Sequence, residues 1–260
     1  MIVVIGLGNI GGAMARRLVA AGQEVCGVDL SAERREEWKE HTGLAALDSV
    51  AAAPWDQVDQ VLVIVRLTHQ AEAVLQELRT LPLRPGTLVL LSSTLEHEYA
   101  KDLSRYDDAD FRLVELPVSG GEGGALAGTL TVMAAGPLTA DDEKYLLSTL
   151  ASHVVHFENF GDPTIAKLIN NVTAGYNARA YADMLILGNE LGLNAVKLAE
   201  VLETSSGGSW MGSAFKVLRD DLLDKDVALL RDQLGSLPVV SLGADQDLIG
   251  RLEQARALLT

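Results

Sequence analysis

Apolar and polar positions along the first 160 residues form short apolar runs separated by amphipathic stretches. The first run, residues 1–5, leads into a glycine-rich turn and a helix-like stretch. Near-continuous apolar strands separated by helices are typical of a parallel sheet that helices cover on both faces. The predicted strands are residues 1–5, 25–28, 61–65, 87–91, 111–116, 129–134 and 154–157, and the predicted helices are residues 10–21, 32–41, 69–78, 95–106 and 140–150.

From Pro163 onwards the pattern becomes helical. Residues 163–191 predict one helix of about 43 Å at 1.5 Å per residue, with Pro163 suited to its first turn and Gly192 to its end. Shorter helices are predicted for residues 195–203, 220–234 and 246–258. We therefore expect an α/β fold of the Rossmann type, with a doubly wound, mainly parallel sheet in residues 1–161. The long helix and a small all-helical C-terminal domain follow in residues 162–260.

The first predicted strand and helix enclose the sequence Gly6-Leu7-Gly8-Asn9-Ile10-Gly11, which has the glycine spacing of a dinucleotide-binding turn. Gly6 permits a tight turn, Gly8 lets the backbone approach a pyrophosphate, and Gly11 lets the helix pack close to the strand. The free N–H groups and the positive dipole end of the helix then face the phosphates. A glycine pattern alone is weak evidence, but the flanking strands and a following acidic residue make a dinucleotide the expected ligand.

Asp29 is that acidic residue, and it ends the second apolar run 18 residues after Gly11. A carboxylate at this place can accept hydrogen bonds from both hydroxyls of a ribose, and it would repel the 2′-phosphate of NADP. NAD is therefore expected rather than NADP. Arg34 and Arg35 lie nearby and leave a bound phosphate open as an alternative, although solvated charges on a Glu/Arg-rich helix are the simpler interpretation.

Composition and charge narrow the class of protein. Hydrophobic residues make up 48% of the 260 residues, which indicates a globular chain. The formal net charge of −15 argues against nucleic acid or an anionic membrane as a partner, and it requires local cations to attract an anionic ligand. Cys26 is the only cysteine, which excludes an internal disulfide. Because no apolar stretch reaches membrane-spanning length and a strand begins at Met1 without room for a signal peptide, a cytoplasmic location is expected.

Hydrolytic and metal-dependent chemistry find little support in the sequence. The histidines are scattered, and His153 and His156 are three residues apart on a predicted strand, which directs them to opposite faces. No metal site is therefore expected. The nucleophile turn of many serine hydrolases, Gly-x-Ser-x-Gly, does not occur in the sequence either.

Two groups of polar residues are candidates for chemistry. Lys167 and Asn171 are four residues apart near the start of the long predicted helix, so an amine and an amide share one face there. This spacing alone is also typical of a solvated helix face. Ser119, Gly120 and Gly121 follow a predicted strand at its carboxyl end, where they offer a hydroxyl and two N–H groups to a carboxylate. A flexible connection between two elements is the alternative for this segment.

Four segments of the chain, in this order, resemble the β-hydroxyacid dehydrogenases, most closely the 3-hydroxyisobutyrate dehydrogenase branch. They fall within about residues 1–235 and are Gly6-Leu7-Gly8-Asn9-Ile10-Gly11 with Met14 and Leu18, Pro117-Val118-Ser119-Gly120-Gly121 continuing into Gly128-Thr129-Leu130, Lys167-Leu168-Ile169-Asn170-Asn171, and Lys225-Asp226. One such motif is weak evidence, whereas four in sequence are specific. The chain departs from the family at Pro163, where glycine is usual, in a shorter segment 210–225, and in a trimmed C-terminal end.

The resemblance implies a role for each of these segments. Lys167 corresponds to the catalytic acid/base, Asn171 to the asparagine that anchors the substrate, and Lys225 to a lysine beside cofactor and substrate. The segment Ser119-Gly120-Gly121 corresponds to the one that binds the substrate carboxylate. Asn170 stands where sugar-phosphate relatives carry histidine, which favours small hydroxy acids over 6-phosphogluconate. Cofactor contacts are expected from Gly6, Leu7, Gly8, Asn9, Ile10, Gly11, Asp29, Leu67, Thr68, Thr94 and Lys225.

These observations together predict an oxidoreductase that transfers a hydride between NAD and a small anionic 3-hydroxy acid similar to 3-hydroxyisobutyrate. Two alternatives stay open. One is an imine-type reductase on the same scaffold, although such relatives usually replace the lysine, and the other is an NAD(H)-binding regulator without turnover. The amphipathic helices of the C-terminal domain predict burial against a second subunit, and hence a homodimer or a higher homo-oligomer.

Overall fold

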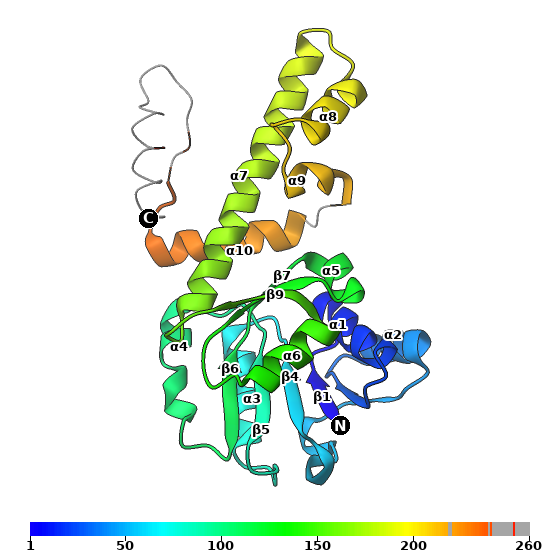
Figure 1. Ribbon diagram of the computed structural model, residues 1–260, viewed down its shortest axis with the longest axis vertical. Helices are drawn as coiled ribbons and strands as arrows, with labels where there is room; N and C mark the ends of the chain where they lie inside the picture. Colours follow the sequence, from blue (N-terminus) through cyan, green and yellow to red (C-terminus); the bar gives the residue numbers. More distant parts are fainter. Residues whose placement is uncertain (218–219, 239, 241–251, 253–260) are drawn as a thin grey trace. The chain divides into compact units, whose positions relative to one another are not determined.

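The computed structural model describes residues 1–217, 220–238, 240 and 252, and the chain divides into two compact units, Met1–Asn170 and Asn171–Thr260. The first unit contains a six-stranded sheet in the order β3-β2-β1-β4-β5-β6, and all of its paired strands are parallel (Figure 1). This order confirms the predicted Rossmann-type sheet. The sheet consists of β1 (Ile2–Ile5), β2 (Val25–Val28), β3 (Ala46–Leu47), β4 (Gln60–Val63), β5 (Thr87–Leu91) and β6 (Phe111–Glu115).

Helices cover both faces of this sheet because successive side chains of each strand point to opposite sides. In β1, Ile2 and Val4 join a buried cluster with α1 and α2, whereas Val3 and Ile5 join a second cluster with α3 and α4. The near-continuous apolar strands of the sequence are thus explained by two separate cores. The helices and short 3-10 turns involved are α1 (Asn9–Ala20), α2 (Ala32–Thr42), η1 (Val50–Ala52), η2 (Trp55–Gln57), α3 (Thr68–Leu78), α4 (His97–Lys101) and η3 (Leu103–Tyr106).

A second, three-stranded sheet completes the first unit and was not foreseen from the sequence. Its order is β7-β8-β9, with β7 antiparallel to β8 and β8 parallel to β9. Two backbone hydrogen bonds between Glu115 and Ala135, of 2.9 and 3.0 Å, join it to β6 of the larger sheet. The elements of this region are β7 (Val118–Ser119), α5 (Gly121–Ala127), β8 (Leu130–Ala134), α6 (Ala140–Thr149) and β9 (Ala151–His156).

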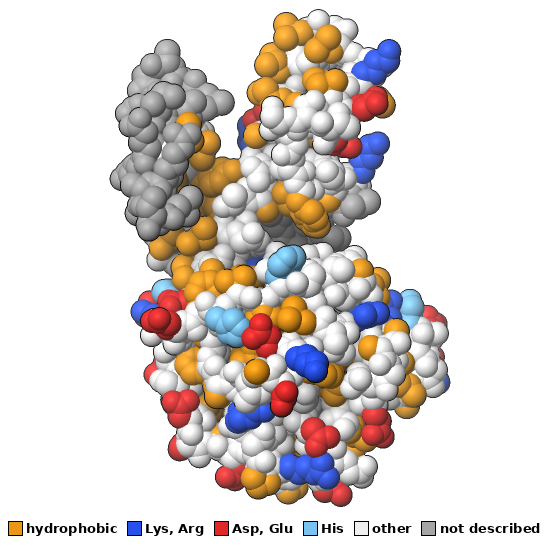
Figure 2. All heavy atoms as spheres, in the orientation of Figure 1, with side chains coloured by type: hydrophobic (Ala, Val, Ile, Leu, Met, Phe, Trp, Pro, Cys, Tyr) orange, Lys and Arg blue, Asp and Glu red, His pale blue; other side chains and the backbone are white. Residues whose placement is uncertain are grey.

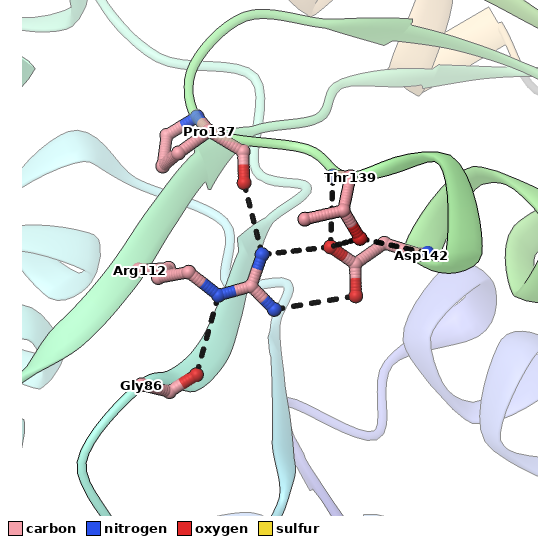
Figure 3. Close-up of polar contacts among 5 residues, drawn as sticks. All are labelled: Gly86, Arg112, Pro137, Thr139 and Asp142. Atoms are coloured by element: carbon pink, nitrogen blue, oxygen red, sulfur yellow. Dashed lines mark hydrogen bonds and ion pairs between the residues drawn. The ribbon is translucent and has the colours of Figure 1, made fainter.

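Arg112 links β6 to helix α6 and to the chain segment before it (Figure 3). Its Nη1 and Nη2 donate to the two carboxylate oxygens of Asp142 in α6, at 2.7 and 3.2 Å, and Nη1 also donates to the carbonyl of Pro137 at 3.0 Å. Asp142 also accepts from the backbone and hydroxyl of Thr139 in the capping box of α6. Burial acts to raise the pKa of Asp142, but the hydrogen bonds from Arg112 and Thr139 prevail and lower it to about 2.

Cys26, the single cysteine, lies in β2 opposite Val3 of β1. The side chain is half-buried, and burial raises the pKa of its thiol. It therefore acts as a small residue packed against the core of the first unit.

Several predicted boundaries differ from the structure for identifiable reasons. The predicted helix 95–106 is interrupted at Asp102, after which the tighter turn η3 places Leu103 and Tyr106, three residues apart, on one buried side. The predicted strand 61–65 ends at Val63, because the N–H of Val65 donates to the Ser93 hydroxyl instead of to a neighbouring strand. The predicted strand 154–157 is longer, Ala151–His156, and the predicted helix 246–258 lies outside the described residues except for Leu252.

The long predicted helix is confirmed as α7 (Asp162–Glu190), which has 29 residues and contains Pro163 in its first turn. In the second unit, α7 continues to a stop before Gly192, whose φ of 83° suits only glycine without strain. A Cβ on Gly188 would lie 2.1 Å from the Leu198 side chain, so this glycine lets α7 and α8 approach closely. The other elements are α8 (Ala195–Thr204), α9 (Trp210–Ser213), η4 (Phe215–Val217) and α10 (Asp220–Leu234).

Tyr181 organises the centre of the second unit. Its hydroxyl donates to Glu203 at 3.1 Å, and its ring lies 5.0 Å from that of Phe215. Gly212 packs against the same ring, where a Cβ would approach to 3.0 Å.

Among the described residues, no helix is long and apolar enough to cross a membrane. The division of the chain at 161/162 that the sequence suggests stays a prediction.

Candidate functional site

The glycine turn connects β1 to α1, as the sequence predicts. Gly6 has a φ of 98°, and a Cβ there would lie 2.2 Å from the carbonyl oxygen of Ile64 in the neighbouring chain segment. A Cβ on Gly11 would lie 2.1 Å from the carbonyl oxygen of Gly6. Both glycines are therefore required by the fold itself, through a left-handed backbone at the first and close packing at the second.

Gly8 is different, because the fold gives no reason for it to be glycine. Its φ of −62° suits any residue, and a Cβ would meet nothing within 4 Å. Gly8 is the N-cap of α1, where no side chain caps the helix and no acidic residue stands in the first turn. The bare backbone and the uncapped N–H groups fit an anionic ligand such as a pyrophosphate.

Asp29 lies directly beside this turn. Its Oδ2 accepts the N–H of Leu7 at 2.7 Å, and its Oδ1 accepts the N–H of Ser31 at 2.8 Å. Each carboxylate oxygen keeps acceptor capacity after one such bond, so both can also accept from ribose hydroxyls. The two neighbouring arginines are engaged elsewhere: Arg34 pairs with Glu37 at 2.7 Å, and Arg35 donates to the backbone carbonyls of Asp29 and Leu30 at 2.8 and 2.9 Å.

Two loops follow the carboxyl ends of β4 and β5 and are joined by hydroxyl groups. The N–H of Val65 donates to Ser93 Oγ at 2.8 Å, and the N–H of Glu96 donates to Thr68 Oγ1 at 3.0 Å. The predicted cofactor residues Leu67 and Thr94 lie on these loops, with Leu67 as the N-cap of α3 and Thr68 as the first residue of that helix. Because the strand order reverses between β1 and β4, the loops stand at the switch point where such sheets bind ligands.

Arg66 lies on the first of these loops and was missed by the sequence reasoning. It is exposed, and its backbone N–H is fixed by Gln70 Oε1 at 3.1 Å. Within Met1–Asn170 it is the one arginine whose guanidinium has no hydrogen bond or ion pair. The others are Arg16, Arg17, Arg34, Arg35, Arg79, Arg84, Arg105 and Arg112, and each donates to a carboxylate or a carbonyl. The signal in the sequence was a lone cation directly after an apolar strand.

The Ser-Gly-Gly segment lies against the start of α7, and the hydrogen bond between them comes from Asn170, the residue before the predicted Asn171. Asn170 Nδ2 donates to Ser119 Oγ at 3.3 Å. Lys167 lies one turn earlier on α7 and is half-buried. Gly120 and Gly121 both have positive φ angles, 134° and 64°, and α5 begins at Gly121. The glycine-rich segment is thus the start of a helix rather than a flexible connection.

Glu115 is a second residue that the sequence reasoning missed. It ends β6, is 0% exposed, and its carboxylate accepts the N–H groups of Gly161 and Thr164 at 2.6 and 2.9 Å. Burial raises the pKa of Glu115, partly opposed by the hydrogen bonds from Thr164 and Gly161. The signal in the sequence was a carboxylate at the end of an otherwise apolar run, which a strand pattern alone does not explain.

The remaining predicted residues lie in the second unit. Asn171 follows Lys167 by one turn of α7, and Lys225 is a half-buried residue of α10. Among the described residues, no group of three or more His, Cys, Asp or Glu side chains could hold a metal ion. His153 and His156 both lie in β9, and His156 pairs with Glu143 at 2.9 Å.

The strand order, the glycine turn and Asp29 define a dinucleotide-binding protein of the Rossmann type. Two family models match the chain. The NAD-binding domain of 6-phosphogluconate dehydrogenase matches residues 1–157, and the NAD-binding domain of NADP-dependent 3-hydroxyisobutyrate dehydrogenase matches residues 161–235. The chain belongs to the NAD(P)-dependent β-hydroxyacid dehydrogenase family, as its motifs predict.

Individual proteins that are similar to this chain are dehydrogenases of small hydroxy acids by name. The chain is 30% identical to an L-threonate dehydrogenase of Pectobacterium atrosepticum over 251 residues, covering 91% of this chain and 82% of the relative. It is 31% identical to a probable mitochondrial 3-hydroxyisobutyrate dehydrogenase of Dictyostelium discoideum over 218 residues, covering 81% of this chain and 66% of the relative. A crystal structure of 3-hydroxyisobutyrate dehydrogenase from Salmonella typhimurium superimposes with a TM-score of 0.76 at 25% identity, covering 91% of this chain and 88% of that one.

Proposed function

We propose that the protein oxidises the hydroxyl group of a small 3-hydroxy acid with NAD, reversibly, and that Lys167 is the general acid/base. The fit of the glycine turn to a pyrophosphate and the hydrogen bond between Asn170 and Ser119 support this proposal, because the latter fixes the helix of Lys167 beside the Ser-Gly-Gly segment. The relatives are named for 3-hydroxyisobutyrate and for L-threonate, two small hydroxy acids, and these are the first substrates to test.

NAD, held by the glycine turn and Asp29, would supply the hydride acceptor for the hydroxyl-bearing carbon of the substrate. The protein positions the acid and moves one proton. In the oxidation, the uncharged amine of Lys167 takes the hydroxyl proton, and in the reduction the ammonium returns it to the carbonyl oxygen. Asn171 is proposed to hold the substrate from the next turn of α7, with Ser119, Gly120 and Gly121 donating to its carboxylate and Lys225 beside the cofactor.

We also propose a preference for NAD over NADP. The Asp29 carboxylate is fixed beside the glycine turn by two backbone N–H groups, where it meets ribose hydroxyls but repels a 2′-phosphate. Arg34 and Arg35 are occupied by Glu37 and by backbone carbonyls, so neither is poised for that phosphate. Arg66 supplies the local cation that a chain of net charge −15 needs in order to attract an anionic ligand.

A homodimer or a higher homo-oligomer is proposed for the second unit. Hydrophobic side chains gather on the surface of the helical unit in Figure 2. Clusters of this kind mark protein interfaces more often than isolated exposed apolar residues do. Light scattering at micromolar concentration is expected to give at least twice the chain mass, and a monomeric mass would refute the proposal. The exposed residues include Met184, Ile186, Leu191, Leu193, Val196, Val201 and Trp210.

The decisive experiment for the activity is a panel of 3-hydroxyisobutyrate, L-threonate and related 3-hydroxy acids with NAD and NADP, followed by Lys167→Ala. We expect Lys167→Ala to lower kcat roughly 10²- to 10⁴-fold, the range of a general acid/base, with NADH affinity unchanged. Lys144→Ala, at an exposed lysine of α6, is the matched control and is expected to turn over normally. Near-normal turnover of Lys167→Ala would remove this lysine from the mechanism, and tight NADH binding without turnover on any acid would favour a regulator.

A further inference from the structure

The helix that carries Lys167 is capped by a side chain from another element. In Met1–Asn170, Glu115 is the only charged residue that is buried completely, and it stands at the end of β6. Its Oε2 accepts the N–H of Gly161, the residue before α7, at 2.6 Å. Its Oε1 accepts the N–H of Thr164, the third residue of α7, at 2.9 Å. The carboxylate thus accepts one N–H group just before α7 and one within its first turn, where the positive end of the helix dipole favours an anion.

Every backbone amide at this end of α7 is accounted for. The N–H of Asp162 donates to the carbonyl of Asn159 at 3.3 Å, and the N–H of Ile165 begins the helical pattern by donating to Gly161 at 3.0 Å. Pro163 has no N–H at all. The two amides that remain are the two that Glu115 binds. Because Pro163 needs no acceptor, the single carboxylate of Glu115 completes the set.

A second contact holds the same helix to the same segment of chain. Asn170 donates to Ser119 at 3.3 Å, and residues 115–119 run from Glu115 to Ser119 without interruption. Lys167 lies three residues after Thr164 and three before Asn170, hence between the two contacts on α7. A shift of α7 by one residue, about 1.5 Å along its axis, would leave buried polar groups without partners. The start of the helix therefore has a single register against β6 and β7.

We propose that Glu115 is a positioning residue for the reaction, which fixes the height and rotation of the first turns of α7 and thereby the Lys167 amine relative to Ser119, Gly120 and Gly121. The inference rests on the proposed function, in which Lys167 transfers the proton. Proton transfer requires hydrogen-bond geometry, and a displacement of about 1 Å can lower a rate roughly 100-fold. Glu115 does not need to touch the substrate for this effect.

The test is Glu115→Gln, which keeps the size of the side chain but turns one acceptor into a donor that faces an N–H group. We expect kcat to fall roughly 10- to 100-fold with NADH affinity unchanged. The primary isotope effect on kcat, measured with an acid deuterated at the hydroxyl-bearing carbon, should rise because chemistry becomes slower than product release. Asp142→Asn is the matched control, since Asp142 caps α6 in a similar manner away from Lys167. It should lower Tm without changing kcat or the isotope effect.

The double variant Glu115→Gln/Lys167→Ala shows whether Glu115 acts through Lys167. If it does, Glu115→Gln changes the residual rate of Lys167→Ala by less than about twofold, because the group to be positioned is gone. An equal loss in both backgrounds, or an unchanged kcat in Glu115→Gln, overturns the positioning role while the role of Lys167 stands. A normal rate in Lys167→Ala refutes the proposed function instead, so the two failures are distinguishable.

Hydrogen exchange on the wild-type protein tests the cap even if Glu115→Gln does not fold. The amides of Gly161 and Thr164 are expected to exchange as slowly as those of the core strands β4 and β5, in contrast to the fraying usual at helix ends. Exchange of these two amides at the rate of an exposed loop would overturn the proposal.

Discussion

A substitution at Gly8 should change cofactor affinity but hardly change the stability of the fold, so Gly8→Ala tests the dinucleotide site directly. The new methyl group would occupy space with no atom within 4 Å, on a backbone with a φ of −62° that alanine adopts readily. Loss of glycine flexibility in the unfolded chain stabilises by about 0.4–1 kcal/mol, and the weaker N-cap opposes this by a similar amount. The free energy of unfolding should therefore change by less than about 1 kcal/mol.

Cofactor affinity should respond very differently to the same methyl group. It would stand where the pyrophosphate approaches the N-terminus of α1, and it would displace the phosphates from the N–H groups there. One lost hydrogen bond to a charged group corresponds to about 1.5–3 kcal/mol, which is a roughly 10- to 150-fold rise in Kd. We expect this rise in a fluorescence titration with NADH, together with the loss of thermal stabilisation by NADH.

Gly11→Ala is the matched comparison. A methyl group there would lie 2.1 Å from the carbonyl oxygen of Gly6 and 2.3 Å from the Ile64 side chain, so the core has to move and stability should fall by about 1–3 kcal/mol or more. Gly8→Ala is thus expected to lower NADH affinity more than stability, and Gly11→Ala is expected to lower stability. Binding of NADH by Gly8→Ala within twofold of the wild-type Kd would refute the placement of the pyrophosphate over Gly8.

Three further outcomes follow from contacts in the first unit. Folding lowers the pKa of Asp142 from 3.8 to about 2, so the ionised carboxylate contributes about 2 kcal/mol to the free energy of unfolding. This contribution is complete above about pH 5 and is lost as the pH falls towards 2. Asp142→Asn should therefore flatten this part of a pH–stability profile. Arg66→Ala should weaken NADH binding roughly 2- to 10-fold at low salt and less at high salt; an unchanged Kd would exclude contact with the phosphates. Asp29→Asn should raise the ratio of kcat/KM with NADP to that with NAD, and a falling ratio would contradict the role given to Asp29.

Elements with strong local signals were predictable from the sequence. Residues 87–91 were predicted as a strand with the observed bounds, because an apolar run between polar turns has few alternatives. The long helix was shifted by one residue at either end. The glycine turn and the acidic residue after β2 were also placed correctly, since their meaning depends on residues close in sequence. Local pattern was sufficient wherever the partners of a residue are local.

Elements defined by distant partners could not be predicted. Val118 and Ser119 form a strand only by pairing with β8, and two residues carry no periodicity of their own. The glycine-rich α5 has poor intrinsic helix propensity and forms against α1, where Arg16 pairs with Glu122 at 3.2 Å. Glu115 is a further example, because its partners Gly161 and Thr164 lie more than 40 residues away. Tertiary contacts decide all three cases.

Cys26 carries the only thiol of the chain, so its chemical modification can report on the folding of the nucleotide-binding unit. Its side chain is half-buried and burial raises the pKa of its thiol, so it should react with an alkylating reagent more slowly in the folded chain than in the unfolded chain. The rate of modification would then report how strongly folding protects this thiol, without any engineered label. A ligand that binds only the folded chain should slow the part of that labelling that passes through unfolding, so dinucleotides could be ranked by covalent labelling before any substrate is known.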